Sequence, residues 1–224
     1  MFLALLFQNP ALFVAFLAAV LISLTLHEFS HALVARARGD HTAEREGRLS
    51  LNPFAHLDPL GFLAFLIVGF GWAKPVPYNP YNLKDPKWDA VKIALAGPGM
   101  NLILAAVSAA LWRLLSPSFG VLNLLSAFLY LMVFLNVMLM VFNVIPVHPL
   151  DGSKLFFALF DAPKYEGLRR FVAVRGPQIL ILLVIVSLFT PFNPFFFVTD
   201  PANALCSAFT RTDCLNMVYQ LFGG

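Results

Sequence analysis

Long apolar runs separated by polar segments dominate the chain. Four of these runs reach the length of about 20 residues that a helix needs to cross the hydrocarbon core of a bilayer. They predict membrane-spanning helices over residues 11–35, 91–115, 121–145 and 177–198. We expect the remaining segments to form connections or to lie at the membrane surface.

Two other segments do not fit a simple crossing. The apolar run over residues 60–70 is too short to cross easily and lies between Asp58-Pro59 and Gly71-Trp72, which favours a re-entrant or interfacial segment. Residues 155–174 mix apolar and basic side chains, which favours an interfacial helix, with a short tilted span as the alternative.

These patterns predict an all-α multi-pass membrane protein with four to six transmembrane helices. A re-entrant or short strand-containing segment lies between the first and second core spans. We expect one membrane-embedded domain over residues 1–224, with a core at 11–162 and a C-terminal span and outward-facing tail at 176–224.

Composition agrees with this class. Hydrophobic residues make up 59% of the 224 residues and charged residues 12%, whereas soluble domains have about 45–50% and about 25%. No basic residues precede the N-terminal apolar run, and the run is longer than the apolar core of a signal peptide, which has about 7–15 residues. We therefore expect it to stay in the mature chain. No nucleic-acid-binding motif accompanies the net charge of +3, so we expect no nucleic-acid partner.

Basic side chains set the predicted orientation, because Lys and Arg accumulate in cytoplasmic loops. They cluster after the first span, before the second, and between the third and fourth, at Arg36, Arg38, Arg45, Arg48, Lys74, Lys84, Lys87, Lys92, Lys154, Lys164, Arg169, Arg170 and Arg175. The N-terminus and the tail with Cys206 and Cys214 would then face outward, where a disulfide persists. The sequence leaves open whether these two cysteines are joined.

The first apolar run contains His27-Glu28-Phe29-Ser30-His31 near its predicted cytoplasmic end. On a helix, positions i and i+4 share a face, so both imidazoles can hold one metal ion, while Glu28 can reach an attacking water. Each ionisable side chain within a span costs a few kcal/mol on insertion scales and is a functional-site hypothesis by default. Three of them within five residues favour a metal site over packing.

A catalytic zinc site needs a third protein ligand. Asp151 is the candidate, because it follows the third predicted span at the same cytoplasmic end as the histidines. Pro146 and Pro149 prevent a regular helix there, and irregular backbone at membrane depth is tolerated where it lines a wet cavity. An Asp-Gly pair by itself is typical of an ordinary turn.

The His-Glu-x-x-His motif of the first span, followed much later by Asn143-x-x-Pro146-x-x-x-x-Asp151-Gly152, resembles the site-2 protease family of intramembrane zinc metalloproteases. Two further stretches agree with it, Gly97-Pro98-Gly99-Met100-Asn101 and Gly71-Trp72-Ala73-Lys74-Pro75-Val76-Pro77. The resemblance covers roughly residues 11–162 and is to a minimal member without a PDZ or CBS domain.

The resemblance implies one Zn2+ per chain, held by His27, His31 and Asp151, with Glu28 as general base and Asn143 as an oxyanion or substrate contact. It implies an endopeptidase of the cell membrane that cuts membrane-anchored proteins within the bilayer, near the cytoplasmic face. An anti-sigma factor or another single-span regulator would be the partner.

Three further features suggest roles around this site. His148 stands where the family commonly has Pro. It could touch the metal, contact substrate or an oxyanion, or cap the turn, and we favour a pocket-lining role. Asn101 could contact substrate or hydrogen-bond to the catalytic span. Leu49, Ser50, Leu51 and Asn52 alternate as in a strand, and could pair with an unwound substrate or form a surface hairpin.

Rival functions remain. A metal transporter or other non-proteolytic metal-binding membrane protein could hold His and Asp within the membrane, but would not need a glutamate directly after the first histidine. A di-iron oxidase needs several histidine boxes, and the chain has five histidines in all. A zinc protease whose third ligand is a downstream glutamate would have to use Glu166, in a basic segment. A catalytically dead adaptor is disfavoured because every residue needed for catalysis is present.

Overall fold

A computed structural model describes residues 6–120 and 123–222 of the chain, and their regular secondary structure is helical. Within these residues, four helical segments are long and apolar enough to cross a membrane: α2 (Pro10–Ala37), α5 (Pro86–Phe119), α6 (Leu124–Val144) and the segment Pro163–Phe189, which contains α8 (Glu166–Phe189). The shorter elements are α3 (Thr42–Arg45), η1 (Pro53–Ala55), α4 (Pro59–Val68), η2 (Pro80–Asn82), α7 (Gly152–Leu159), η3 (Pro163–Tyr165), α9 (Phe196–Thr210) and α10 (Cys214–Leu221).

Local sequence explains where the long helices begin. The side chain of Asn9 accepts a hydrogen bond from the backbone N–H of Leu12 at 3.1 Å, and Pro10 occupies the first turn of α2. Asp85 and Pro86 start α5 in the same way. Asn123 caps α6, whereas residues 121 and 122 of the predicted third span lie outside the described residues.

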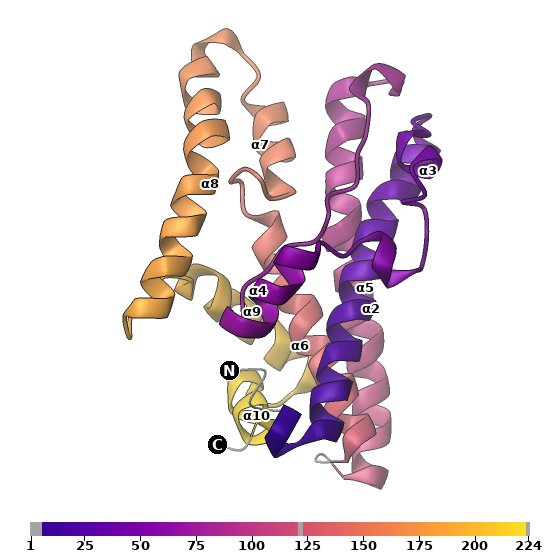
Figure 1. Ribbon diagram of the computed structural model, residues 1–224, viewed down its shortest axis with the longest axis vertical. Coiled ribbons are helices and arrows are strands. Elements are labelled where there is room, and N and C mark those ends of the chain that lie inside the picture. The colour runs from indigo at the N-terminus through magenta and orange to yellow at the C-terminus, as the bar shows by residue number, and fades with distance from the viewer. Residues whose placement is uncertain (1–5, 121–122, 223–224) are drawn as a thin grey trace.

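Helices α2, α5 and α6 pack against one another and form the core of the molecule (Figure 1). Small residues let the backbones approach closely, and Ala19, Ala105 and Ala109 are almost fully buried. Helices α9 and α10 close one end of the bundle, where Cys206 and Cys214 form a disulfide beside the buried Tyr130. The core therefore gives the three helices fixed relative positions.

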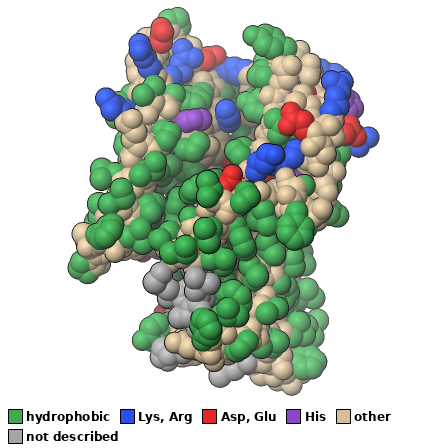
Figure 2. Space-filling model, in the orientation of Figure 1, with side chains coloured by type: hydrophobic (Ala, Val, Ile, Leu, Met, Phe, Trp, Pro, Cys, Tyr) green, Lys and Arg blue, Asp and Glu red, His purple; other side chains and the backbone are tan. Residues whose placement is uncertain are grey.

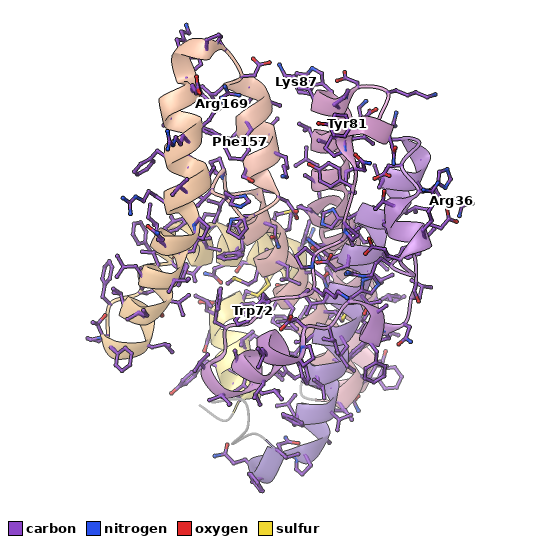
Figure 3. All side chains as sticks on the ribbon, turned by 45° about the horizontal axis from the view of Figure 1, so that its top comes forward. Arg36, Trp72, Tyr81, Lys87, Phe157 and Arg169 are labelled. Carbon is purple, nitrogen blue, oxygen red and sulfur yellow. A yellow bond between two sulfur atoms is a disulfide. The ribbon has the colours of Figure 1, made fainter. Side chains whose placement is uncertain are left out.

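The predicted boundaries near the C-terminus were wrong. Instead of an interfacial helix over 155–174 and a span over 177–198, α7 ends at Leu159 and α8 runs without a break from Glu166 to Phe189. The basic residues of α8 lie in its first half, where long side chains can reach the membrane surface. Figure 3 shows Arg169 of α8 and Lys87 of α5 toward the same end of the molecule, and Figure 2 shows the charged side chains of this face gathered at that end.

The predicted short segment between the first two spans forms α4, a helix of 10 residues. Gly61 of α4 and Gly71 after it lie backbone to backbone, because a Cβ at Gly61 would overlap the carbonyl oxygen of Trp72 and one at Gly71 that of Gly61. The glycines thus let the chain return along its own helix.

The predicted strand over residues 49–52 was wrong. No strand forms within residues 6–120 and 123–222, and an isolated bridge joins Leu57 to Ala73. The Oγ of Ser50 accepts a hydrogen bond from the N–H of Asn52 at 3.1 Å, and the Oδ1 of Asn52 accepts one from Phe54 at 3.1 Å. These side chains satisfy the backbone locally and cap η1, which competes with strand pairing.

Candidate metal centre

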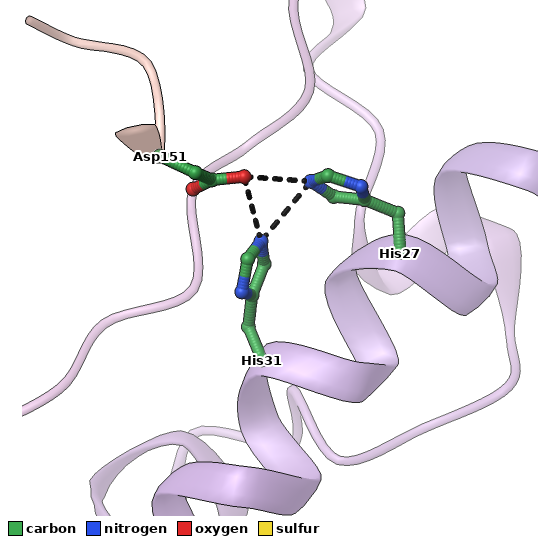
Figure 4. Close-up of side chains that lie close together, drawn as sticks. All are labelled: His27, His31 and Asp151. Atoms are coloured by element: carbon green, nitrogen blue, oxygen red, sulfur yellow. Dashed lines mark hydrogen bonds and ion pairs between the residues drawn. The ribbon is translucent and has the colours of Figure 1, made fainter. Parts of the chain in front are cut away.

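Three candidate ligands meet where α2 approaches the loop between α6 and α7. His27 and His31 lie on successive turns of α2, and Asp151 immediately precedes α7 (Figure 4). The Nε2 atoms of His27 and His31 are 3.0 Å apart. The Oδ2 of Asp151 lies 3.2 Å from the Nε2 of His27 and 3.4 Å from the Nε2 of His31. In the described part of the chain, these residues are the group of three that could hold a metal ion.

The triangle fits a zinc ion. Ligand atoms at about 2.0–2.1 Å from a tetrahedral zinc lie about 3.3 Å from one another, close to the three distances above. The Oδ2 of Asp151 is buried and receives no hydrogen bond within residues 6–120 and 123–222. Two imidazoles and one carboxylate are also a donor set that suits zinc. The residues present therefore match this metal in number, chemistry and spacing.

Each imidazole is held through its Nδ1, the ring nitrogen that does not face the other two candidate ligands. The Nδ1 of His31 lies 2.7 Å from the carbonyl oxygen of Ile93 on α5. A carbonyl can only accept, so Nδ1 carries the proton and the lone pair of Nε2 points into the centre. The Nδ1 of His27 lies 2.5 Å from the Oδ1 of Asn101, also on α5.

Two glycines are required for this arrangement. A Cβ at Gly97 of α5 would lie 2.5 Å from the Cε1 of His27 and 2.5 Å from the Nε2 of His31, so α5 passes directly behind both rings. A Cβ at Gly152 would overlap the carbonyl oxygen of Val144, so glycine lets the loop fold back over the end of α6. The glycines of both sequence motifs thus bring Asp151 to the histidines.

Glu28 follows His27 on α2 and is 8% exposed. Its negative charge acts on His31 and on Arg48. Burial lowers the pKa of Arg48, which the charge of Glu28 opposes. The guanidinium of Arg48 donates hydrogen bonds to the carbonyl oxygens of Lys74 and Pro75, the latter at 3.0 Å, and so fixes the segment after α4 near the centre.

Other residues singled out in the sequence lie outside the triangle. Asn143, near the end of α6, is half-buried and donates to the carbonyl oxygen of Leu139 on its own helix at 3.0 Å. His148 lies in the loop before Asp151, where burial and then the charge of Lys154 lower its pKa and favour the neutral ring. Residues 49–52 form the bend between α3 and η1. Asn101 is fully buried against His27, so its amide faces a candidate ligand.

Two residues that the sequence did not identify are connected to His27 through hydrogen bonds of Asn101, namely Ser23 on α2 and Asn136 on α6. Both are fully buried. Their signal is a polar side chain in the middle of an otherwise apolar span, which is costly unless a partner satisfies it. The sequence does not show which partner each one meets.

Comparison with known proteins gives two kinds of match. The model of peptidase family M50 matches residues 15–121 and 120–190. "Putative zinc metalloprotease YwhC" of Bacillus subtilis is 42% identical over 142 residues, which are 61% of this chain and 64% of that protein. The chain thus spans just under two thirds of the length of that relative.

"Putative zinc metalloprotease Rip2" of Mycolicibacterium smegmatis is 34% identical over 192 residues, which are 83% of this chain and 71% of that protein. Rip2 of Mycobacterium tuberculosis H37Rv is 32% identical with the same coverage of both chains. No solved structure matches the chain. The match to the family model covers both segments that supply the candidate ligands.

Proposed function

Because this chain belongs to peptidase family M50, the site-2 protease family, we propose that it is a zinc-dependent endopeptidase that cuts transmembrane segments within the bilayer. The family acts on membrane-anchored substrates. The observation that carries the proposal is the convergence of His27, His31 and Asp151 on one point, with Glu28 adjacent on the same helix.

His27, His31 and Asp151 would hold one zinc ion per chain. Bound there, zinc supplies Lewis-acid polarisation of the peptide carbonyl and a lowered pKa of the attacking water. The carboxylate of Glu28 accepts the proton of that water and passes it to the leaving amine. Asn143 and His148 contact the substrate or its developing oxyanion from the loop side.

The proposed topology places the active site toward the cytoplasmic side of a multi-pass protein of the cell membrane. Lys and Arg gather at the end where α3, α7 and the start of α5 lie (Figures 1 and 2), as the distribution of basic residues in cytoplasmic loops requires. The substrate would be a single-span regulator such as an anti-sigma factor. We propose that residues 1–224 act as one membrane-embedded unit.

The test is cleavage of a tagged single-span model substrate by the purified protein in detergent. We expect the wild type to cut and to contain one zinc per chain. Glu28→Gln should retain zinc and lose about 10²–10⁴-fold in activity, because the proton acceptor is gone. Chelation should abolish cleavage, and added zinc should restore it.

The matched control is Glu46→Gln, which removes an exposed carboxylate outside the membrane-spanning helices and should cut at the wild-type rate. A Glu28→Gln variant that cuts as fast as the wild type would contradict the proposal. Zinc binding without any cleavage, together with metal flux into liposomes, would favour the metal transporter.

A further inference from the structure

A continuous line of buried hydrogen bonds leads from His27 to the opposite helix of the core. Asn101 on α5 contacts the Nδ1 of His27 through its Oδ1 and donates from its Nδ2 to the Oδ1 of Asn136 at 2.7 Å. Asn136 on α6 donates from its Nδ2 to the Oγ of Ser23 at 2.8 Å and to the carbonyl oxygen of Met132 at 2.7 Å. The line thus connects α2, α5 and α6.

At the end of this line away from His27, the amide of Asn136 has only one allowed orientation. The carbonyl of Met132 can only accept, so the Asn136 atom facing it must be the NH2 group. Ser23 agrees, because its hydroxyl donates to the carbonyl oxygen of Ala19 at 2.7 Å and therefore accepts from Asn136. The carbonyl of Met132 fixes the orientation of the Asn136 amide, and the contact with Ser23 is consistent with it.

That orientation propagates to the candidate ligand. With its NH2 group committed, Asn136 presents its oxygen to Asn101, so Asn101 must present its own NH2 group to Asn136 and its oxygen to His27. An oxygen at 2.5 Å from the Nδ1 of His27 requires the proton on Nδ1. The Nε2 of His27 then keeps its lone pair toward His31 and Asp151.

Burial makes the arrangement rigid. Ser23, Asn101 and Asn136 are fully buried, and no water replaces a lost partner in the hydrocarbon layer. Hydrogen bonds between helices of this kind also hold bundles together. A packing role alone, however, would not require the unbroken donor-to-acceptor sequence that ends on a candidate metal ligand.

We propose that Asn136, supported by Ser23, is a positioning residue that sets the tautomer and ring orientation of His27 through Asn101. The inference rests on the proposed function, since it concerns a ligand of the proposed zinc site. Loss of an outer partner of a metal-binding histidine typically costs 10–100-fold in metal affinity.

The test uses Asn136→Leu and Ser23→Ala in the full chain purified in detergent. We expect Asn136→Leu to weaken zinc binding by about 10–100-fold in a chelator competition and to change the d–d absorption spectrum of the cobalt-substituted protein. In 15N spectra of histidine-labelled protein, the Nδ1-protonated form of His27 should lose population. Ser23→Ala should shift each readout in the same direction but by less, because Asn136 keeps its hydrogen bond to the carbonyl oxygen of Met132.

Ser126→Ala is the matched control for Ser23→Ala. Ser126 is also a buried serine of the core, 1% exposed on α6, and its Oγ makes no hydrogen bond within the described part of the chain. We expect the zinc affinity and the cobalt spectrum of the Ser126→Ala variant to equal those of the wild type. Thermal unfolding of all variants separates loss of fold from loss of metal affinity.

The outcomes separate the two proposals. If folded Asn136→Leu and Ser23→Ala bind zinc as the wild type does, with the same cobalt spectrum, the positioning role is wrong while the zinc site stands. If the wild type binds neither zinc nor cobalt, the proposed function fails. Lower stability with unchanged affinity would reduce Asn136 to a packing residue and overturn the inference.

Discussion

The helices of the core and helix α8 differ sharply in how they are held. About half of the apolar stretch of α2 and α6 is buried within the protein, 50% in each, against 11% for the span that contains α8. Of the residues of α8, Gly176 and Leu180 are buried, and many of its apolar side chains are exposed. The candidate centre takes His27 and His31 from the first region, and Asp151 from the loop that leads to the second.

This difference suggests a division of roles. The core fixes two candidate ligands by packing and by a hydrogen bond at the Nδ1 of each ring, as preorganised sites require. The position of the third candidate ligand, Asp151, depends on the packing of the loop over residues 145–151, and one neighbour of that loop is Gly176 of α8. Substitutions at glycines in the two regions should therefore affect the centre to different degrees.

The largest effect is expected at Gly97. In Gly97→Ala, the new methyl group would displace both imidazoles, because its position lies 2.5 Å from atoms of His27 and His31. A displacement of about 1 Å can cost 10²-fold in rate, so we expect about a 10²-fold loss of cleavage together with weaker zinc binding. Cleavage assays and zinc titration measure the two.

Gly99→Ala is the control on the same helix, since a Cβ at Gly99 meets no atom within 4 Å. It should cut at the wild-type rate and gain up to about 1 kcal/mol in stability, because alanine is favoured over glycine within a helix. Equal activity of the two variants would show that contact of α5 with the rings is unimportant.

A smaller effect is expected at Gly176. A Cβ there would overlap the carbonyl oxygen of His148 and lie 3.1 Å from the Cγ1 of Val147. Gly176→Ala should shift the loop before Asp151 and lower cleavage by about tenfold, less than Gly97→Ala because the loosely held α8 can move away. Thermal unfolding should change little, because most of α8 is exposed.

Gly167→Ala provides the comparison within α8, because a Cβ at Gly167 meets no atom within 4 Å. We expect unchanged cleavage. If Gly176→Ala were instead as damaging as Gly97→Ala, α8 would have to be held as firmly as the core, and the contrast between the two regions would not stand.

The same contrast explains what the sequence could predict. Helical periodicity is a local property, so the shared face of His27 and His31 followed directly, and topology placed Asp151 at their depth. The partners of Ser23 and Asn136 depend on how three helices are rotated against one another, which apolar runs do not encode. The strand over 49–52 failed because Ser50 and Asn52 bond to nearby backbone, an outcome that alternation alone does not reveal.

The smallest effect concerns the connection between α2 and α5, which Asp40 attaches to the core. Its Oδ1 accepts hydrogen bonds from the N–H and hydroxyl of Thr42 and from the amide of Asn82, and its Oδ2 accepts one from the N–H of Asn79. Burial acts to raise the pKa of Asp40, and these hydrogen bonds outweigh it and hold the pKa below its ordinary value. Asp40→Asn should lose about 2 kcal/mol of unfolding free energy at neutral pH, the usual worth of a hydrogen bond to a charged group.

The pH dependence has a definite sign. Because the pKa of Asp40 is lower in the folded state than the unfolded value of about 3.9, the stabilisation is complete above that value and is lost as the pH falls through the folded pKa. Unfolding of the wild type and Asp40→Asn in detergent should therefore converge at low pH. Asp161→Asn, which removes an exposed partner of Lys87 beside α7, should lose much less at neutral pH, and an equal loss in both variants would mean that the connection is no better anchored than the α7 region.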